Sequence, residues 1–398
     1  MRPCETRFRP LRWLRRTEMR RMTSDSKSNA HRSFDLFSSE NSLESIFVIR
    51  QPNDPQLDLL CEQLHQLAAQ ETWPAASLAA CGEAGVYRWF LSAENGGFGW
   101  SDADVVRGYL KLSAACLTTT FIITQRTGAC RRIAGSGNEG ARQSLLPDLA
   151  SGATFATVGI SHLTTSRRHL AKPVLGASLD GDGFLLDGYS PWVTGGVYAD
   201  TLVVGATLPD GRELLAAVPG DAPGVSAEQP ADLVGLTGSA TGMVKFSQVR
   251  ISSDDVLAGP VENVMKAGVG AKTGGLETST LAIGLAMAAA AYIRDEAVKR
   301  PELHAPAESF AQELSDLEND LLSAAAGEPQ CSTEQLRSRA NSIALRTTQA
   351  ALSAAKGAGY VTGHPVGRWC REALFFLVWS CPQPVQQANL CELAGILD

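Results

Sequence analysis

The sequence lacks the patterns that mark several large classes of protein. Its nine cysteines are an odd number with no Cys-x-x-Cys pair among them, so we expect neither a disulfide framework nor a zinc ribbon. The longest nearly uncharged apolar run, Leu281 to Ile293, has thirteen residues, fewer than the about 18 that suggest a membrane span. No P-loop, metal-ligand cluster or Ser-His-Asp order is present. We therefore expect a soluble, cytoplasmic protein that binds no metal.

Charge is also scarce, at 19% of the 398 residues, and the net charge is −7. The first 22 residues hold eight Arg against Glu5 and Glu18 and carry +6, which leaves −13 for the rest of the chain. A body of this charge has no basic surface for nucleic acid. The arginine-rich start lacks the apolar core of a secretory signal and is a transit peptide, a solvated arm, or sequence upstream of a true start at Met19 or Met22. We predict that residues 1–45 lie outside the fold.

The rest of the chain changes its pattern twice. Apolar residues at helical spacing, as in residues 102–115 and 139–149, predict an all-helical domain over residues 46–150. Short β-branched and apolar runs separated by glycine turns predict a β-barrel domain over residues 151–258. Alanine-rich helical segments then predict a tight helical bundle over residues 259–398.

Five segments carry more specific motifs, and they occur in this order: AENGGFGWSDADV (93–105), GSGNEGARQSLLPDLASG (135–152), LDGDGFLLDGYSPWVTGGVYADTLVVGA (179–206), GLTGSATGMVKFSQVRI (235–251) and KGAGYVTGHPVGRWCREA (356–373). Together they resemble the acyl-CoA dehydrogenase flavoprotein family over about residues 55–395. The family fold is mostly helical, with an N-terminal helical domain, a middle β-barrel and a C-terminal four-helix bundle. That fold agrees with the three domains predicted above.

The resemblance implies roles for residues around a flavin. Trp192 and Thr194 match the family residues that pack on the isoalloxazine ring and reach its N5 edge, although an aromatic residue there also suits a plain strand. Ser161 falls where the family has the Thr of a Thr-Glu pair, and its hydroxyl can hydrogen-bond flavin. His162 replaces the Glu of that pair and is interpreted as a structural residue.

Two further segments correspond to the phosphates and the adenosine of FAD. Thr165 and Ser166, together with Thr164, stand where the family has Gly-Ser-Asp, and they are either phosphate contacts or loop hydroxyls. Gly357 and Gly359 match the glycine turn near the adenosine, where the close approach of a ligand to the backbone needs a residue without a side chain. The alternative for these two glycines is a helix C-terminal cap.

The usual catalytic base of the family is missing. Counting from Arg368 through Arg371, the position of that Glu is Ser380, whose alcohol is not basic enough near pH 7 unless another group activates it. Some family members carry the base on the first bundle helix, at a position that corresponds to Gly274. Glu277 lies three residues further on and is a candidate relocated base. The alternative is an acidic residue in a first helical turn, where the helix dipole stabilises it.

The resemblance implies an FAD-dependent oxidoreductase of fatty acid metabolism that acts on the CH–CH group of an acyl-CoA or related thioester. Such a dehydrogenase needs an electron-transfer partner. Two alternatives keep the same fold: a flavin-dependent monooxygenase or oxidase, and a catalytically silent acyl-CoA-binding or scaffold protein. The apolar bundle face predicts a homodimer or homotetramer.

Overall fold

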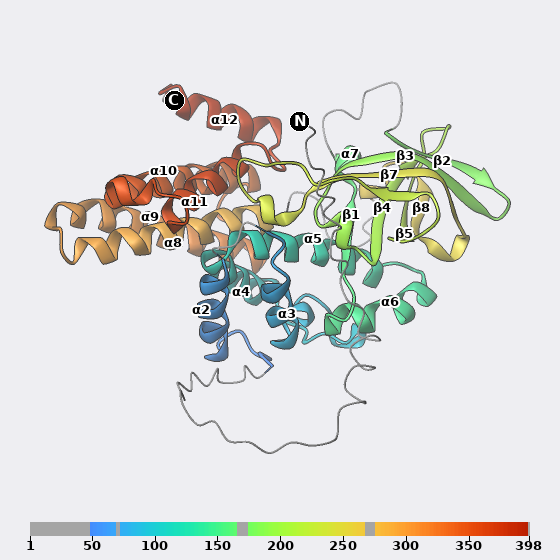
Figure 1. The fold of residues 1–398 in the computed structure, drawn as a ribbon, viewed down its shortest axis with the longest axis horizontal. Coiled ribbons are helices and arrows are strands. Elements are labelled where there is room, and N and C mark those ends of the chain that lie inside the picture. Colours follow the sequence, from blue (N-terminus) through green and yellow to red (C-terminus); the bar gives the residue numbers. More distant parts are fainter. Residues whose placement is uncertain (1–47, 69–71, 165–173, 267–274, 397–398) are drawn as a thin grey trace, which may run out of the picture. The chain divides into compact units, whose positions relative to one another are not determined.

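Five helices come first in the described part of the chain, which comprises residues 48–68, 72–164, 174–266 and 275–396 of this computed structural model (Figure 1). Ser101 caps α4, because its side chain accepts a hydrogen bond from the backbone N–H of Asp104 at 3.2 Å. The helices pack around a buried cluster that includes Trp89 and Tyr109. Their bounds are α2 Gln56–Leu67, α3 Ala75–Glu83, α4 Asp102–Ala115, α5 Leu117–Ala134 and α6 Glu139–Ser151.

Within the described ranges, eight strands then form one sheet, with the short helix α7 (Ser161–Thr164) between the first two. The order is β6-β7-β3-β2-β4-β5-β8, and β1 pairs in parallel with β4 outside this path. The bounds are β1 Ala156–Gly159, β2 Leu175–Asp180, β3 Gly183–Val193, β4 Thr201–Thr207, β5 Glu213–Pro219, β6 Val225–Ala227, β7 Gly242–Ile251 and β8 Val256–Val261.

The sheet is open, so the predicted closed β-barrel is not confirmed. Among the described residues, β6 pairs with β7 and β8 pairs with β5, but no ladder joins β6 to β8. Strand β6 has three residues, all of which pair with β7. Register shifts between β3 and β7 curve the sheet without closing it.

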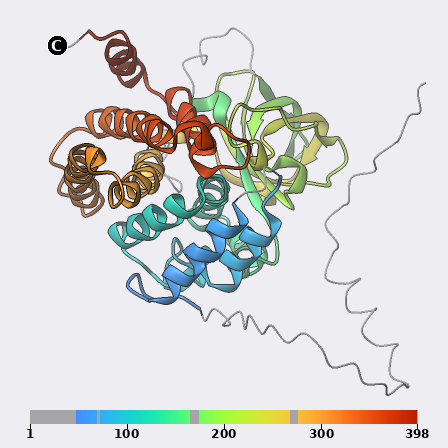
Figure 2. The same ribbon diagram turned by 60° about the vertical axis from the view of Figure 1, so that its left-hand side comes forward.

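Helices return after the sheet and form the C-terminal bundle. In both Figure 1 and Figure 2 these helices lie beside the sheet. Helices α2–α6 lie below the bundle and the sheet in both views. Close approach of α8 to α4 depends on Gly284, because a Cβ there would lie 2.8 Å from the carbonyl oxygen of Leu110. The bounds are α8 Glu277–Ala297, α9 His304–Ala325, α10 Thr333–Gly359, α11 Pro365–Ala373 and α12 Gln383–Leu393.

One helix, α5, is common to three apolar clusters. Phe121 packs into the cluster of the C-terminal helices, Ile123 into that of the N-terminal helices, and Ile133 into the cluster beneath the sheet. All three side chains are buried. Helix α5 is therefore a shared wall between the helical regions and the sheet, and it fixes the positions of the site residues near its C-terminal end.

Several predictions fall on residues outside the described ranges. The arginine-rich extension with Met19 and Met22, the pair Thr165 and Ser166, and Gly274 all lie there. The domain boundaries at residues 150 and 258 stay predictions. None of the described helices combines the length and the apolar character that crossing a membrane requires.

Candidate functional site

The flavin-side residues predicted from the sequence lie at the ends of β1 and β3. Ser161 follows β1 and begins α7. Its Oγ is shielded from solvent and has no hydrogen-bond partner among the described residues. A buried hydroxyl without a partner is uncommon, since burial removes its contact with water at a cost of about 1–3 kcal/mol. Ser161 is therefore available to a bound group.

His162 is held by the sheet. Its Nε2 lies 2.8 Å from the carbonyl oxygen of Gly205 on β4. Burial lowers the pKa of the imidazole, while the bond to Gly205 and the charge of Glu213 act in the opposite direction. The interpretation of His162 as structural is consistent with this bond but leaves its Nδ1 unexplained, because that atom is buried and has no partner.

Trp192 and Thr194 stand two residues apart and differ sharply in exposure. Trp192, near the end of β3, is 59% exposed. Thr194 is only 3% exposed, and its Oγ1 is 3.0 Å from Oγ1 of Thr241, which in turn lies 2.8 Å from Oγ of Ser239. The hydroxyl of Thr194 thus already belongs to a buried chain of hydroxyls, whereas the face of Trp192 is open.

Glu277 is the first residue of α8 and faces arginines on α5. Its Oε1 lies 3.3 Å from Nη1 of Arg131, whose Nη2 is also 3.9 Å from Asp102. Burial lowers the pKa of Arg132 to about 10, and the negative charge of Glu277 partly offsets this shift. Glu277 is therefore a carboxylate fixed by an ion pair at the junction of α5 and α8.

Ser380 lies in a segment that α10 holds through its backbone. Nη2 of Arg337 donates to the carbonyl oxygens of Ser380 and Trp379, and Nδ2 of Asn341, one helical turn further along α10, donates to that of Phe376 at 3.0 Å. Ser380 itself has a φ of 45°, in the left-handed region. The backbone turn at the predicted base position is thus tightly held although its side chain is not a base.

Arg337, which holds the backbone of Ser380, is also influenced by the negative charge of Glu277. The residue is 3% exposed, and burial lowers the pKa of its guanidinium to about 10, opposed by Cys381 and by the charge of Glu277. Sequence reasoning missed Arg337, because its partners lie more than 40 residues away and no local motif marks it.

The two glycines of the proposed adenosine turn differ from one another. Gly357 is exposed and a Cβ there would meet nothing within 4 Å, whereas a Cβ on Gly359 would lie 2.7 Å from that of Ala355. Gly357 leaves the backbone open to a ligand, and Gly359 is required by packing inside the bundle. The preceding Lys356 has φ 55° and ψ −147°, a backbone conformation that is close to glycine-only.

A small cavity elsewhere contains none of the predicted residues. It measures about 20 Å³ and is lined by Thr118, Gly235 and Arg368, among others.

A family model and curated relatives described as acyl-CoA dehydrogenases match parts of this chain. Residues 59–153 match the family model of the acyl-CoA dehydrogenase N-terminal domain. The probable acyl-CoA dehydrogenase YngJ of Bacillus subtilis (strain 168) is 26% identical over 245 residues, which are 60% of this chain and 64% of YngJ, less than two thirds of its length. The short-chain-specific acyl-CoA dehydrogenase of Clostridium acetobutylicum is 24% identical over 345 residues, 80% of this chain and 89% of that protein.

Solved structures show the same fold. Butyryl-CoA dehydrogenase from Megasphaera elsdenii has a TM-score of 0.72 at 17% identity and covers 85% of this chain and 97% of its own. FMN-bound TdsC from Paenibacillus sp. A11-2 has a TM-score of 0.71 at 17% identity, with the same coverage of both chains. At these identities the likeness concerns the arrangement of helices and strands alone.

Proposed function

Because the chain is a member of the acyl-CoA dehydrogenase family, we propose that it is a flavin-dependent oxidoreductase that acts on the CH–CH group of an acyl-CoA or related thioester. The observation that carries the proposal is the carboxylate of Glu277, the first residue of α8, which is fixed by an ion pair with Arg131 on α5. Oxidation at this group needs a base for the α-proton, and Glu277 supplies one where Ser380 does not.

The residues present fit FAD at three points. The exposed ring of Trp192 offers a stacking surface, the shielded Oγ of Ser161 has no protein partner, and the backbone at Gly357 is open. When bound, FAD accepts the hydride that leaves the β-carbon. Thr194 supports this site indirectly, because its hydroxyl chain with Thr241 holds the residues after β3. Thr165 and Ser166 stay proposed phosphate contacts.

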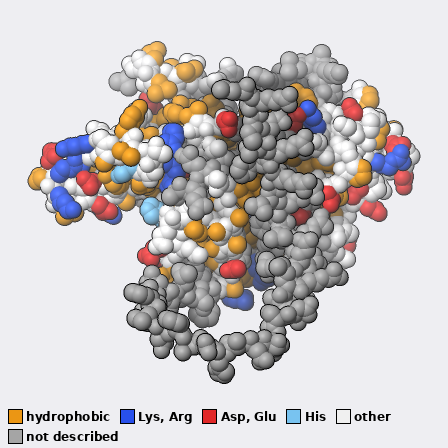
Figure 3. All heavy atoms as spheres, in the orientation of Figure 1, with side chains coloured by type: hydrophobic (Ala, Val, Ile, Leu, Met, Phe, Trp, Pro, Cys, Tyr) orange, Lys and Arg blue, Asp and Glu red, His pale blue; other side chains and the backbone are white. Residues whose placement is uncertain are grey.

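Assembly into a homodimer or homotetramer is also part of the proposal. Large apolar side chains in and around α12 are exposed, among them Val378 at 77%, Leu390 at 56% and Leu393 at 62%. Figure 3 shows hydrophobic side chains on the surface of this region. Such a surface is typical of an interface. We also propose an electron-transfer protein as a second partner and a cytoplasmic location.

A flavin monooxygenase is the second candidate, favoured by one observation. The carboxylate expected in the last helices is absent at Ser380, and a reaction that does not remove an α-proton needs none there. The silent acyl-CoA-binding protein is the third candidate.

One experiment distinguishes the three. The purified protein is reconstituted with FAD, its visible spectrum is recorded, and acyl-CoA thioesters of several chain lengths are added without oxygen. We expect bound flavin that bleaches with at least one thioester. Flavin that stays oxidised with every thioester would exclude the dehydrogenase, and a failure to bind flavin would exclude both enzymes and leave the silent protein.

The role of Glu277 is tested by Glu277→Gln. Loss of the base should slow bleaching at least about a hundredfold, because general base catalysis contributes about 10²–10⁴-fold, while flavin stays bound. Glu296→Gln, on the same helix α8 near its far end, is the matched control and should bleach as the unaltered protein does. Bleaching at the normal rate in Glu277→Gln would remove Glu277 as base.

A further inference from the structure

Only one of the two carboxylate oxygens of Glu277 has a partner in the described part of the chain. Nη1 of Arg131 lies 3.3 Å from Oε1, and no described residue forms a hydrogen bond or an ion pair with Oε2. The Glu277 side chain is 31% exposed, and Oε2 is not one of the polar atoms shielded from solvent. The carboxylate is therefore held by one oxygen while the other stays open to a small molecule.

The two helices that carry this ion pair are both anchored close to it. On α5, the side chain of Ile133, two residues after Arg131, is fully buried in the cluster beneath the sheet. On α8, one turn after Glu277, the carbonyl oxygen of Leu281 accepts a hydrogen bond of 2.8 Å from Oγ of Ser113 on α4. Because both backbones are fixed, the contact between the two side chains decides where the carboxylate lies.

Arg131 also contacts a second carboxylate, through its other terminal nitrogen. Its Nη2 lies 3.9 Å from Oδ1 of Asp102, whose side chain is 79% exposed, so water screens this pair and it contributes little to stability. A guanidinium is planar, and contacts through two of its nitrogens limit its rotation. Arg131 therefore offers Nη1 to Glu277 in a restricted orientation.

We propose that Arg131 is a positioning residue: it holds Oε1 of Glu277 and so directs Oε2 toward the α-carbon of the thioester, where Oε2 takes the proton. The C–H bond at the α-carbon breaks and an O–H bond forms at Oε2. The electron pair of the broken bond forms the α,β double bond as the hydride leaves the β-carbon for FAD. This inference rests on the proposed function, since it presupposes that Glu277 is the base.

A double-mutant cycle separates this role from a purely structural one. An ion pair between two helices can serve stability alone, and the helix dipole favours an acidic residue in the first turn of α8 in any case. The single variants are Arg131→Gln, Arg131→Lys and Glu277→Gln, and both Arg131 substitutions are also made together with Glu277→Gln. Each protein is reconstituted with FAD, and anaerobic bleaching is followed over a range of concentrations of a thioester that bleaches the unaltered protein. The measurement gives a limiting rate and a half-saturating concentration.

We expect Arg131→Gln to lower the limiting rate about tenfold, the effect of one charge-assisted hydrogen bond, with the half-saturating concentration within about twofold because Arg131 acts through Glu277. Arg131→Lys keeps a charged donor and should lower the limiting rate only about two- to threefold. When Glu277→Gln is present, neither Arg131 substitution should slow bleaching further. Arg107→Gln removes another ion pair of an arginine, to Asp104 at 2.8 Å on α4, and is the control that should bleach like the unaltered protein.

The outcomes are separable. If Arg131→Gln bleaches at the normal rate, or slows bleaching equally with and without Glu277, Arg131 is structural and the inference is wrong, although the proposed function stands. A higher half-saturating concentration at an unchanged limiting rate would show that Arg131 binds the thioester itself and would also overturn it. If Arg131→Gln does not fold, the same comparison with Arg131→Lys decides. If no thioester bleaches the unaltered protein, or if Glu277→Gln bleaches normally, the proposed function fails and the inference fails with it.

Discussion

Burial decides what a motif residue can do, and two neighbours demonstrate this. The sequence pattern treats Trp192 and Thr194 alike, yet the ring of Trp192 is 59% exposed and Thr194 is 3% exposed. The motif could assign both residues to one segment but could not predict which of them has a free hydrogen-bonding group. That depends on Thr241, which lies 47 residues away along the chain.

Replacement of Lys356 by glycine is expected to stabilise the protein. Its φ of 55° with ψ −147° costs about 1–3 kcal/mol for a residue with a side chain, and glycine adopts this conformation without strain. We expect Lys356→Gly to raise the free energy of unfolding by about 1 kcal/mol, as measured in urea. Lys356→Ala keeps the Cβ and is the control. If Lys356→Gly is no more stable than Lys356→Ala, the backbone conformation at this position is not strained.

His162 should make stability depend on pH. Its folded pKa lies below the ordinary value of about 6.5, so in that window the unfolded chain binds more protons than the folded one. The contribution of His162 to the free energy of unfolding is present above about pH 6.5 and is lost as the pH falls through the pKa of the folded state. Urea unfolding of the flavin-free protein at pH 7.5 and 5.5 should show a smaller decrease for His162→Gln than for the unaltered protein. His65→Gln should leave the decrease unchanged; equal slopes in all three would contradict the expectation.

Among the secondary-structure elements, local patterns predicted the helices well. The spacing over residues 102–115 and 139–149 corresponds to α4 at Asp102–Ala115 and α6 at Glu139–Ser151. Closure of the sheet could not be predicted in this way. It depends on whether β6 and β8 meet, and neither strand carries a local signal for its partner.

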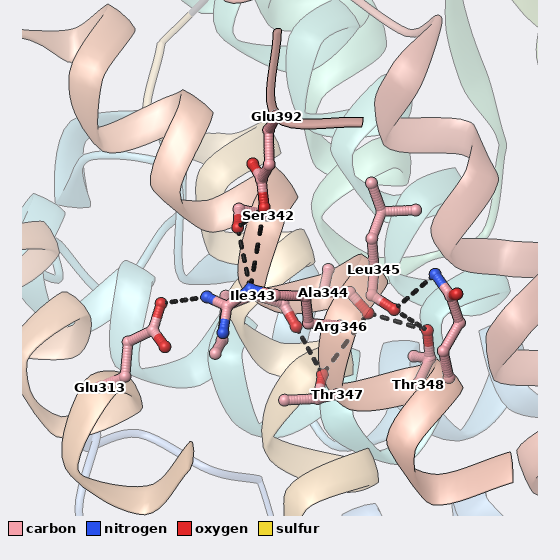
Figure 4. A network of polar contacts seen from close by, with 10 residues as sticks. Glu313, Ser342, Ile343, Ala344, Leu345, Arg346, Thr347, Thr348 and Glu392 are labelled. Atoms are coloured by element: carbon pink, nitrogen blue, oxygen red, sulfur yellow. Dashed lines mark hydrogen bonds and ion pairs between the residues drawn. The ribbon is translucent and has the colours of Figure 1, made fainter. Parts of the chain in front are cut away.

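Helix α12 is attached to the bundle by a surface network, shown in Figure 4. Arg346 on α10 bonds to Glu313 on α9 and to Ser342, and Ser342 donates to Glu392 on α12 at 2.5 Å. These side chains are about one third or more exposed, so each pair contributes at most about 1 kcal/mol. The network therefore governs the docking of α12 more than the stability of the whole chain.

Loss of Glu392 should release α12 selectively. In Glu392→Gln we expect faster hydrogen exchange at the α12 amides, with a change of less than about 1 kcal/mol in the global free energy of unfolding. Added salt should have the same effect on the unaltered protein. Glu328→Gln, an exposed position between α9 and α10, serves as control. Unchanged exchange in α12 would show that apolar contacts alone hold the helix.

For the molecule as a whole, the position of α5 between three apolar clusters leads us to expect cooperative unfolding. Its side chains belong to three apolar clusters, so no cluster can lose its packing without disturbing the others. We expect Ile123→Ala to lower the free energy of unfolding by about 2–5 kcal/mol and to move the transitions seen by tryptophan fluorescence and by far-UV circular dichroism together. Val234→Ala, at a 71% exposed position, should move neither. Two separated transitions would show that the clusters around α5 unfold independently and would contradict this expectation.

The shared wall also bears on how such a chain can be divided and recombined. The family model ends at residue 153 and so contains all of α5, yet Phe121 and Ile133 complete clusters formed with residues from later in the chain. A protein fragment cut at that boundary would expose those side chains to water and be prone to aggregate. Residues 59–153, which the family model matches, are thus not expected to fold on their own. Chimaeras of related proteins should therefore exchange α5 together with the parts of the sheet and the bundle that pack against it.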